Sequence, residues 1–452
     1  MISLSEHFTF GKLIRFTLPS IAMMICASVY GVVDGFFVSN FVGTIPFAAL
    51  NLVIPILMIL GSIGFMIGTG GSALVAKLLG RGRQETANSV FSFLVYALIG
   101  FGIVLAGVGN FFLGDIVKAL GASGEMLGDC LAYGHIVLAG LPFLMMQNAF
   151  QSFLVTAEHP KAGFAITVSA GLVNVALDAV FIVLFDWGLK GAALATVIGE
   201  CVGGLVPLCI FLFNRNWNLK LGKCHLNGVA LFRTLTNGSS EFMTNISLSI
   251  VTIFYNWQLM RFIGDKGVAI YGVIMYVGTI FLSSLIGFAI GSAPLVSYHL
   301  GAGNRNELHN LFKKSLVVVG TLDLILTAAA ILFAEPLSGI FLRHDPALLA
   351  ETSKALSLYA ISFLFVGFNI FASAFFTALN NGSVSAALAF VRTLVFELLF
   401  VLLIPELFGA ESIWFSITFA EIFALAVSGL ALYKYRNRYG YAGDGIKIRK
   451  SA

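Results

Sequence analysis

Four polar residues interrupt long apolar stretches in the first half of the chain, and their types suit the binding of a proton or a small cation. Asp34 stands in VYGVVDGFFVSN, Asp178 stands in GLVNVALDAVFIV with Asn174 one helical turn before it, and Thr196 stands in GLKGAALATVIGE. An aspartate at the centre of a membrane helix costs roughly 2.5 to 3.5 kcal/mol on insertion scales, so such a residue is a functional candidate. Burial favours the protonated carboxyl, and oxygen ligands also suit hard cations. These residues therefore predict a site for H⁺ or Na⁺.

Structural explanations stand beside this functional one. Each aspartate could instead hydrogen-bond a neighbouring helix, and a threonine in a membrane helix often donates to its own i−4 carbonyl. Glu200, four residues after Thr196 on the same helix face, is a candidate supporting residue. Glu241 is expected as a solvated carboxylate at the cytoplasmic mouth of a span. Three single acids in the apolar stretches of the second half are secondary candidates for a proton or substrate site: Asp323, Glu397 and Glu421.

The composition of the whole chain excludes a soluble protein. Hydrophobic residues make up 58% and charged residues 11% of the 452 residues, and the mean hydropathy is +0.95, whereas soluble domains carry about 25% charged residues. Because a membrane helix needs about 20 apolar residues, we predict twelve spans, at approximately 15–42, 47–76, 89–112, 130–156, 162–185, 190–213, 240–262, 268–300, 314–335, 355–379, 385–407 and 411–433. No P-loop motif for an ATP-driven pump and no nucleophile with its base occurs, so we expect neither an enzyme nor a nucleic-acid binder.

A matched glycine motif divides the spans into two sets of six. LLGRGRQETAN contains Gly80 and HLGAGNRNELHN contains Gly301, and each motif follows a long apolar stretch. Six spans per set give both sets the same orientation, so the repeat is parallel, as in some secondary transporters. We predict an all-α integral membrane protein with an N-terminal lobe at 1–213, a cytoplasmic linker at 214–239, and a C-terminal lobe at 240–452 that ends in a short basic tail.

The distribution of cations predicts the orientation in the membrane. Most of the 26 Lys and Arg residues fall at span ends and loops on one side, which the positive-inside rule assigns to the cytoplasm. Both termini are therefore expected in the cytoplasm. The cytoplasmic cations include Arg81, Arg215, Lys447, Arg449 and Lys450, whereas Arg343 is among the few expected outside and Arg392 falls just inside the eleventh span.

The chain resembles the multidrug and toxic compound extrusion family, in particular its bacterial multidrug exporters. The resemblance rests on Pro19 and Asp34 in the first span, the stretch GTGGSALVAKLLGRGR from Gly68, AEHPKAG leading to Asn174 and Asp178, and GLKGAA before Thr196. It implies a V-shaped pair of six-helix bundles that exports organic, often cationic compounds in exchange for H⁺ or Na⁺. Carried over to this chain, the ion site would be Asp34, Asn174, Asp178 and Thr196.

One departure from the family limits the ion site to the N-terminal lobe. Some relatives carry cation-binding carboxylates in spans seven and ten, but here span seven has none after Glu241 and span ten has no acid. Loading of the ion is expected to reshape the first span around Pro19, because proline lacks the backbone donor and bends helices. A minority of the aromatic, methionine and glutamine residues are expected to line a cavity for flat cations: Phe36, Phe37, Met145, Met146, Gln147, Phe150, Gln151 and Phe153.

The resemblance leaves two functions open. The first is an antiporter that exports lipophilic, mainly cationic small molecules across a bacterial inner membrane, as a monomer in the lipid bilayer and without a cofactor other than H⁺ or Na⁺. The second is a flippase of the same superfamily that moves lipids or cell-wall precursors. Flippases of this kind usually carry a more cationic central cavity, and Arg392 is the one cation predicted inside a span rather than at its end. The sequence therefore favours the antiporter.

Overall fold

The computed structural model describes residues 2–214, 216–342 and 345–441. Within these ranges the chain is helical apart from short turns and linkers, and no strand occurs. Eleven helical segments of the described chain are long and apolar enough to cross a membrane, so the chain is a multi-pass membrane protein. Arg215, Arg343 and the predicted basic tail with Lys447, Arg449 and Lys450 lie outside the described residues.

The N-terminal lobe is a bundle of long helices, two of which end in π-helical segments. Its elements are α1 (Phe10–Phe37), η1 (Val38–Val42), α2 (Thr44–Gly80), α3 (Gln84–Ala119), α4 (Gly124–Thr156), α5 (Pro160–Asp178), η2 (Ala179–Leu184) and α6 (Gly188–Phe213). The π-helical segment η1 continues α1, and η2 continues α5 directly after Asp178. Such segments are rare and frequently occur at functional sites, so both mark the two helices that carry the predicted aspartates.

The C-terminal lobe repeats the arrangement with more interruptions. Its elements are α7 (Gly228–Phe262), α8 (Asp265–Ala302), α9 (Arg305–Leu332), α10 (Ala334–Leu342), α11 (Pro346–Tyr359), η3 (Ala360–Ser362), α12 (Phe363–Ala378), α13 (Gly382–Phe390), η4 (Val391–Phe396), α14 (Glu397–Phe408), η5 (Ala410–Phe415) and α15 (Ser416–Tyr439). The segments α11 to α12, α13 to α14 and η5 to α15 each form one long span. This confirms the all-α fold with two lobes.

Helix α7 is the predicted span that is too polar to count among the eleven apolar segments. Its 35 residues extend over about 52 Å at 1.5 Å per residue, longer than the roughly 30 Å core of a bilayer. Several of its polar residues face other helices rather than lipid: Thr234, Asn237 and Ser240 are at most 5% exposed. The helix begins at Gly228, inside the segment 214–239 that was expected to be a linker. The exact division into lobes stays a prediction.

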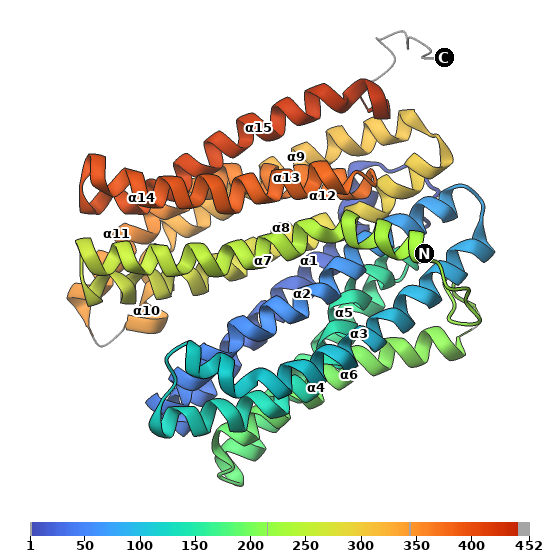
Figure 1. Ribbon diagram of the computed structural model, residues 1–452. Coiled ribbons are helices and arrows are strands. Elements are labelled where there is room, and N and C mark those ends of the chain that lie inside the picture. Colours follow the sequence, from blue (N-terminus) through green and yellow to red (C-terminus); the bar gives the residue numbers. More distant parts are fainter. Residues whose placement is uncertain (1, 215, 343–344, 442–452) are drawn as a thin grey trace.

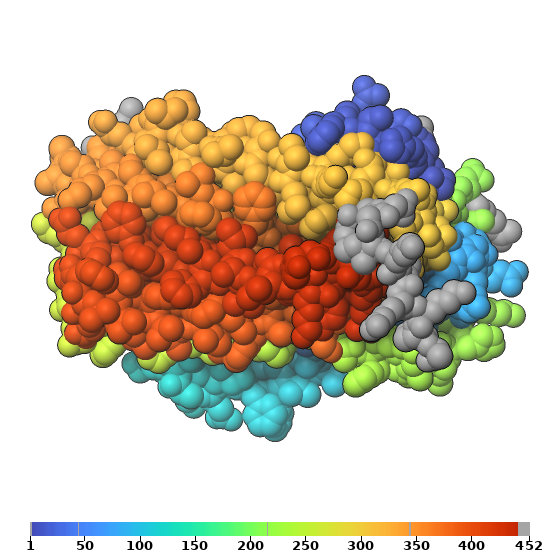
Figure 2. All heavy atoms as spheres, turned by 90° about the horizontal axis from the view of Figure 1, so that it is seen from above, coloured from blue at the N-terminus to red at the C-terminus, as the bar shows by residue number. Residues whose placement is uncertain are grey.

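The two lobes meet at the end of the molecule that carries the N-terminal residues and the end of α15, and they diverge towards the other end (Figure 1). Helices α1 and α2 of the N-terminal lobe make most of the contacts, α1 with α8 and α2 with α7 and α8. We call the end at which the lobes meet the closed end. Figure 2 shows the C-terminal lobe from above, with the N-terminal residues lying beside the first part of α9 at this closed end.

The matched glycines touch across the lobes at the closed end. A Cβ atom at Gly80 would lie 2.9 Å from the carbonyl carbon of Tyr298 on α8, and a Cβ atom at Gly301 would lie 2.9 Å from the carbonyl carbon of Lys77 on α2. Both would be nearer still to the carbonyl oxygens. Only glycine allows the two backbones to approach this closely. The repeated motif therefore marks a reciprocal contact that holds the lobes together.

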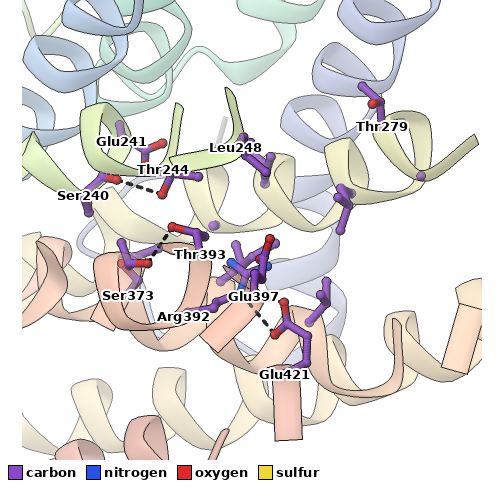
Figure 3. A pocket seen from close by; sticks show the side chains of 18 of the residues that line it. Ser240, Glu241, Thr244, Leu248, Thr279, Ser373, Arg392, Thr393, Glu397 and Glu421 are labelled. Carbon is purple, nitrogen blue, oxygen red and sulfur yellow. Dashed lines mark hydrogen bonds and ion pairs between the residues drawn. The ribbon is translucent and has the colours of Figure 1, made fainter. Parts of the chain in front are cut away.

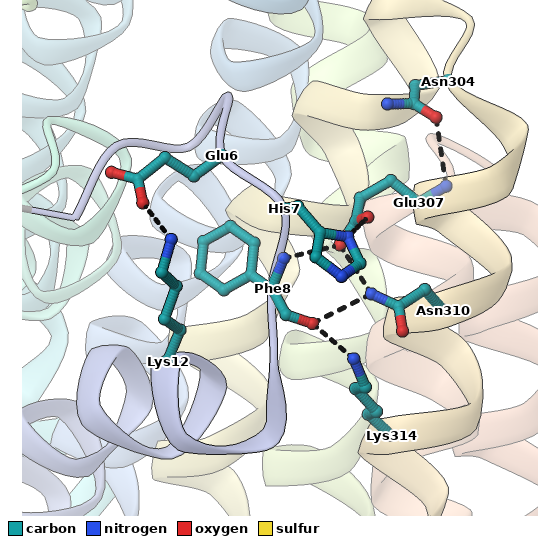
Figure 4. Close-up of polar contacts among 8 residues, drawn as sticks. All are labelled: Glu6, His7, Phe8, Lys12, Asn304, Glu307, Asn310 and Lys314. Atoms are coloured by element: carbon teal, nitrogen blue, oxygen red, sulfur yellow. Dashed lines mark hydrogen bonds and ion pairs between the residues drawn. The ribbon is translucent and has the colours of Figure 1, made fainter.

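The N-terminal segment, residues 3–8, is bound to both lobes at the closed end. The backbone N–H of Leu4 donates to Glu158 Oε1 at 2.7 Å, in the turn between α4 and α5. The N–H of Phe8 donates to Glu307 Oε1 at 2.9 Å, and Lys314 Nζ donates to the Phe8 carbonyl at 2.6 Å, both from α9 (Figure 4). The side chains of Leu4 and Phe8 are buried. This segment therefore ties the turn after α4 to α9.

Candidate functional site

The structure brings the four predicted ion-site residues to the place where α1, α5 and α6 meet. Asp34 lies on α1, Asp178 ends α5, and Thr196 lies on α6. The carboxyl groups of Asp34 and Asp178 face each other, with the Thr196 side chain beside Asp34. Asn174 lies one turn before Asp178 and is buried against Gly199 of α6. We call these four residues the N-lobe cluster.

The N-lobe cluster is rich in oxygen lone pairs and poor in hydrogen-bond donors. Thr196 Oγ1 lies 3.0 Å from the carbonyl oxygen of Ala192 and beside Asp34, so its single proton serves one of these two acceptors at a time. Among the described residues, Asp34 Oδ1, both carboxyl oxygens of Asp178 and both polar atoms of Asn174 have no hydrogen-bond partner. A buried acceptor left unpaired costs about 1–3 kcal/mol, and more when it is charged. A shared proton or a bound cation would satisfy these oxygens.

A second layer of polar side chains surrounds this cluster. Tyr30, one turn before Asp34 on α1, accepts a hydrogen bond from Gln147 Nε2 at 2.9 Å. Glu200 is close enough for its charge to act on Tyr30, and its Oε2 atom has no partner among the described residues. Tyr133 of α4 also lies near the acids. Glu200 and Gln147 were predicted as candidates from the sequence, whereas the two tyrosines were not. Tyr30 was detectable from its i, i+4 spacing to Asp34.

Pro19 lies in the part of α1 nearest the closed end, and the helix continues through it. The neighbouring Ser20 hydroxyl is buried without a partner among the described residues. Pro19 precedes Asp34 by 15 positions, so the two residues lie roughly 22 Å apart along the helix axis at 1.5 Å per residue. The proposed bending of α1 on ion loading stays a prediction.

The predicted cavity residues mostly lie elsewhere than expected. Phe150, Phe153 and Met145 are at most 1% exposed. The ring of Phe153 packs on Phe91 at a centre distance of 4.9 Å, and that of Phe150 packs on Phe211 at 5.6 Å. They belong to the core among α2, α3, α4 and α6 and contact no space that admits water, which corrects the expectation that they line a cavity. Apolar packing between helices explains the difference.

The other candidates divide between the N-lobe core and the surface. Met146 and Gln151 are almost fully buried on α4, and the Gln151 Oε1 atom has no partner among the described residues. Phe36 is 57% exposed, and Phe37 stacks on Phe41 of η1 at 5.7 Å. Phe36 and Phe37 therefore lie at the end of α1 away from the closed end, not in an enclosed cavity.

A cavity of about 170 Å³ opens between the lobes, with most of its wall in the C-terminal lobe (Figure 3). Helices α7, α8, α12, α14 and α15 and the segment η4 supply most of the lining, and Thr69, Ser72 and Ser152 come from the N-terminal lobe. Apolar side chains such as Leu282 and Ile286 lie beside hydroxyl groups and acids. This mixture is typical of small-molecule sites.

Three charged residues of the cavity wall lie close together, and their proximity was not predicted from the sequence. Arg392 Nε on η4 donates to Glu421 Oε1 at 2.8 Å and to Oε2 at 3.1 Å (Figure 3). Glu397, five residues after Arg392, lies close enough for its charge to act on the guanidinium. Asn369 Nδ2 of α12 donates to Glu421 Oε2 at 2.7 Å. Asp323 on α9 packs against Gly367 of α12, close enough to Glu421 and Arg392 for their charges to act on it.

Glu241 also lies in the cavity wall, which corrects its expected place at a solvated helix end. Since α7 begins at Gly228, Glu241 lies several turns inside the helix and faces the cavity with Ser240 and Thr244 (Figure 3). In the part of the chain that the structure describes, no three His, Cys, Asp or Glu residues are grouped to hold a metal ion. A Na⁺ ion at the N-lobe cluster would therefore depend on amide and hydroxyl oxygens as well as carboxylates.

Comparison with known proteins gives matches over both lobes. A family model described as MatE matches residues 19–180 and again residues 242–403. Multidrug export protein MepA of Staphylococcus aureus is 24% identical over 434 residues, covering 95% of this chain and 94% of MepA. MepA of Staphylococcus saprophyticus is 23% identical over 431 residues with the same coverage.

Solved structures share the fold along almost the whole chain. The structure described as "Crystal structure of MATE in complex with MaL6" superposes with a TM-score of 0.91 at 21% identity, covering 96% of this chain and 98% of that one. A MOP superfamily transporter from Pyrococcus furiosus, described as having a binding pocket of reverse polarity, superposes with a TM-score of 0.89 at 21% identity, covering 96% and 97%. At these identities the structures establish the fold alone.

Proposed function

The chain belongs to the multidrug and toxic compound extrusion family, and from this premise we propose that it is a secondary antiporter. It exports lipophilic, mainly cationic organic compounds in exchange for H⁺ or Na⁺. The two family matches, one in each lobe, and the similarity to the MepA exporters support a transporter rather than an enzyme. We place it in a bacterial inner membrane as a monomer with both termini in the cytoplasm, so that the closed end faces the cytoplasm.

The observation that carries this proposal is the donor-poor N-lobe cluster. Two facing carboxyl groups, Asp34 and Asp178, have no lysine or arginine partner among the described ion pairs. Two adjacent carboxylates cannot both stay charged at low cost in an apolar bundle, so the cluster holds a proton or a cation. One net charge moved across 100 mV is worth about 2.3 kcal/mol, which drives export of an uncharged substrate roughly fiftyfold uphill. One-for-one exchange with a monovalent cation moves no net charge and depends on the concentration gradient of the ion.

We propose that the substrate occupies the cavity between the lobes. Glu241 and Glu397 place carboxyl groups in its wall, and Tyr271 and Tyr359 supply aromatic faces. A flat organic cation gains from both, through Coulomb attraction and cation–π contact. In the proposed cycle, loading of the N-lobe cluster with the ion changes the path of α1 and releases the substrate.

The test is dye efflux from inverted vesicles that are energised by a pH gradient or by a Na⁺ gradient. Wild-type protein is compared with Asp34→Asn and Asp178→Asn, and with Asp115→Asn, an exposed acid on α3, as the matched control. We expect ethidium transport to follow one gradient, to fail in the two cluster variants and to persist in the control. Transport by the cluster variants at the wild-type rate would refute the ion site, and transport that ignores both gradients would refute antiport.

A further inference from the structure

The cationic side chain of Arg392 lies in the cavity wall among acids, and some of its hydrogen-bond donors are used by no described residue. Arg392 makes its hydrogen bonds to described residues through Nε alone, both to Glu421. Its terminal nitrogens, Nη1 and Nη2, bond no described residue, and they are not among the fully buried polar atoms. Because Arg392 lines the cavity and its side chain keeps 14% of its exposed area, these two nitrogens are accessible from the cavity (Figure 3).

A chain of hydrogen bonds on the side away from the cavity fixes the orientation of this guanidinium group. Glu421 is 1% exposed, and it accepts a second hydrogen bond from Asn369 Nδ2 at 2.7 Å. Asn369 is itself held by Ser428, which donates to its Oδ1 at 2.9 Å. The π-helical segment η4 supplies Arg392 to this arrangement. The guanidinium is therefore pre-organised, and its planar pair of free donors matches a group with two acceptor oxygens.

The charge balance of the wall defines the ligand that would use these donors. Arg392 and Glu421 form an ion pair, and Glu397 lies near the same guanidinium. Glu241 and Glu397 line the same cavity without a side-chain hydrogen bond or ion pair to a described residue, and their oxygens are not fully buried. A simple anion would be repelled by these two acids, whereas a simple cation would leave the Arg392 donors unused. A ligand that carries both charges satisfies both sides of the wall.

We propose that Arg392 forms an anion-accepting subsite for the carboxylate of zwitterionic aromatic substrates, whose cationic group lies towards Glu241 and Glu397. This subsite rests on the proposed function, because it lies in the proposed substrate cavity. It adds a second recognition element to the negative charge that attracts cations. A carboxylate at Arg392 forms charge-assisted, bidentate hydrogen bonds, which are stronger than neutral ones.

A matched pair of dyes separates the two elements. Rhodamine B carries a cationic ring system and a free carboxylate, and its ethyl ester carries the same ring system without the negative charge. Binding of both dyes to purified protein is measured by fluorescence polarisation at neutral pH. The double variant Arg392→Gln/Glu421→Gln removes both partners of the ion pair, since removal of the arginine alone would leave a buried charge. Arg392→Lys is the second variant and keeps the charge but loses the planar fork.

We expect wild-type protein to bind rhodamine B at least as tightly as the ester. In the double variant we expect rhodamine B to lose roughly tenfold to a hundredfold in affinity, the range of hydrogen bonds to charged groups, and the ester to change by less than about threefold. Arg392→Lys is expected to weaken rhodamine B selectively and by a smaller factor. The melting temperature of each variant reports whether the lobe is intact.

Three results would overturn the subsite. The first is wild-type protein that binds the ester but not rhodamine B. The second is an equal loss of both dyes in a folded double variant, which would make Arg392 a structural residue. The third is a folded Arg392→Lys variant that discriminates between the dyes as wild type does. Wild-type protein that binds neither dye would instead refute the multidrug cavity itself, and the subsite with it.

Discussion

The contact of the matched glycines predicts that one methyl group on α8 opens the closed end. In Gly301→Ala, the new Cβ atom would lie 2.9 Å from the Lys77 carbonyl carbon and 3.0 Å from its Cα, whereas ordinary Cβ contacts are 3.4–4 Å. Both partners are backbone atoms of a packed helix, so α2 and α8 must separate by roughly 1 Å. Overpacking of this kind costs about 1–3 kcal/mol.

This strain exists only while the lobes touch at the closed end. It therefore shifts the equilibrium between this arrangement and one in which the lobes are separated at that end. A difference of about 1–3 kcal/mol between two states shifts their ratio roughly 5- to 150-fold. Spin labels at Glu85 and Asn306, exposed positions on the first turns of α3 and α9, report the separation of the lobes at the closed end by electron paramagnetic resonance. The background protein has its five cysteines replaced by serine. We expect the longer-distance population to become dominant in Gly301→Ala.

The matched control lies on the same helix. Gly272 of α8 has no atom within 4 Å of the position of its missing Cβ, so Gly272→Ala adds a methyl group without overlap and favours the helix by about 1 kcal/mol. Its distance distribution should equal that of the parent protein. If Gly301→Ala gives the same distribution as Gly272→Ala, the glycine contact does not control closure and the reasoning is refuted.

Three further predictions concern the ion site and the N-terminal segment. Tyr30→Phe removes the hydroxyl that accepts a hydrogen bond from Gln147 beside the acids. We expect ion-driven efflux to slow about tenfold while dye binding stays within about twofold. Equal effects on efflux and binding would contradict a role of Tyr30 at the ion site. If Na⁺ is the coupling ion, NaCl should raise the melting temperature of wild type more than choline chloride does, and Asp178→Asn should abolish the difference. Glu307→Gln weakens the hydrogen bond that the Phe8 N–H donates to residue 307. We therefore expect amide hydrogen exchange of residues 3–8 to accelerate roughly 5- to 150-fold. Exchange at the wild-type rate would show that other contacts hold the segment.

The acids of the proposed ion site could be singled out from the sequence because membrane helices tolerate few charges. Asp34 and Asp178 are each isolated in an apolar stretch, which alone marks them as candidates. Their meeting in space required more than periodicity, since they lie on helices far apart in the chain, and the family resemblance supplied that step. Tyr133 gave no signal, because a tyrosine in an apolar helix is as common at a lipid interface as at a polar cluster.

The substrate cavity could not be predicted for a related reason. The sequence around Phe150 and Phe153 does not distinguish a side chain that faces lipid from one that faces a cavity or another helix. Only the packing of α3, α4 and α6 decides among these three environments. Glu241 was misplaced because hydropathy treats every polar residue near a span as solvated, whereas α7 buries its polar residues inside the protein. The pairing of Arg392 with Glu421 joins η4 to α15, and no local spacing encodes it.

Helix α1 connects the proposed ion site to the proposed substrate cavity. It carries Asp34 towards one end and Pro19 towards the other, and it packs against both α5 and α8. Near Pro19 the contact with α8 has little slack: a Cβ atom at Gly287 would lie 2.6 Å from the Cα atom of Ile21. The neighbouring residue Ile286 lines the cavity. A change in the path of α1 at Pro19 must therefore displace the cavity-lining face of α8, because backbones in direct contact cannot absorb the movement in side-chain rotation. In the proposed cycle, ion loading at the α5 side of α1 is thereby coupled to the shape of the proposed substrate cavity at its α8 side.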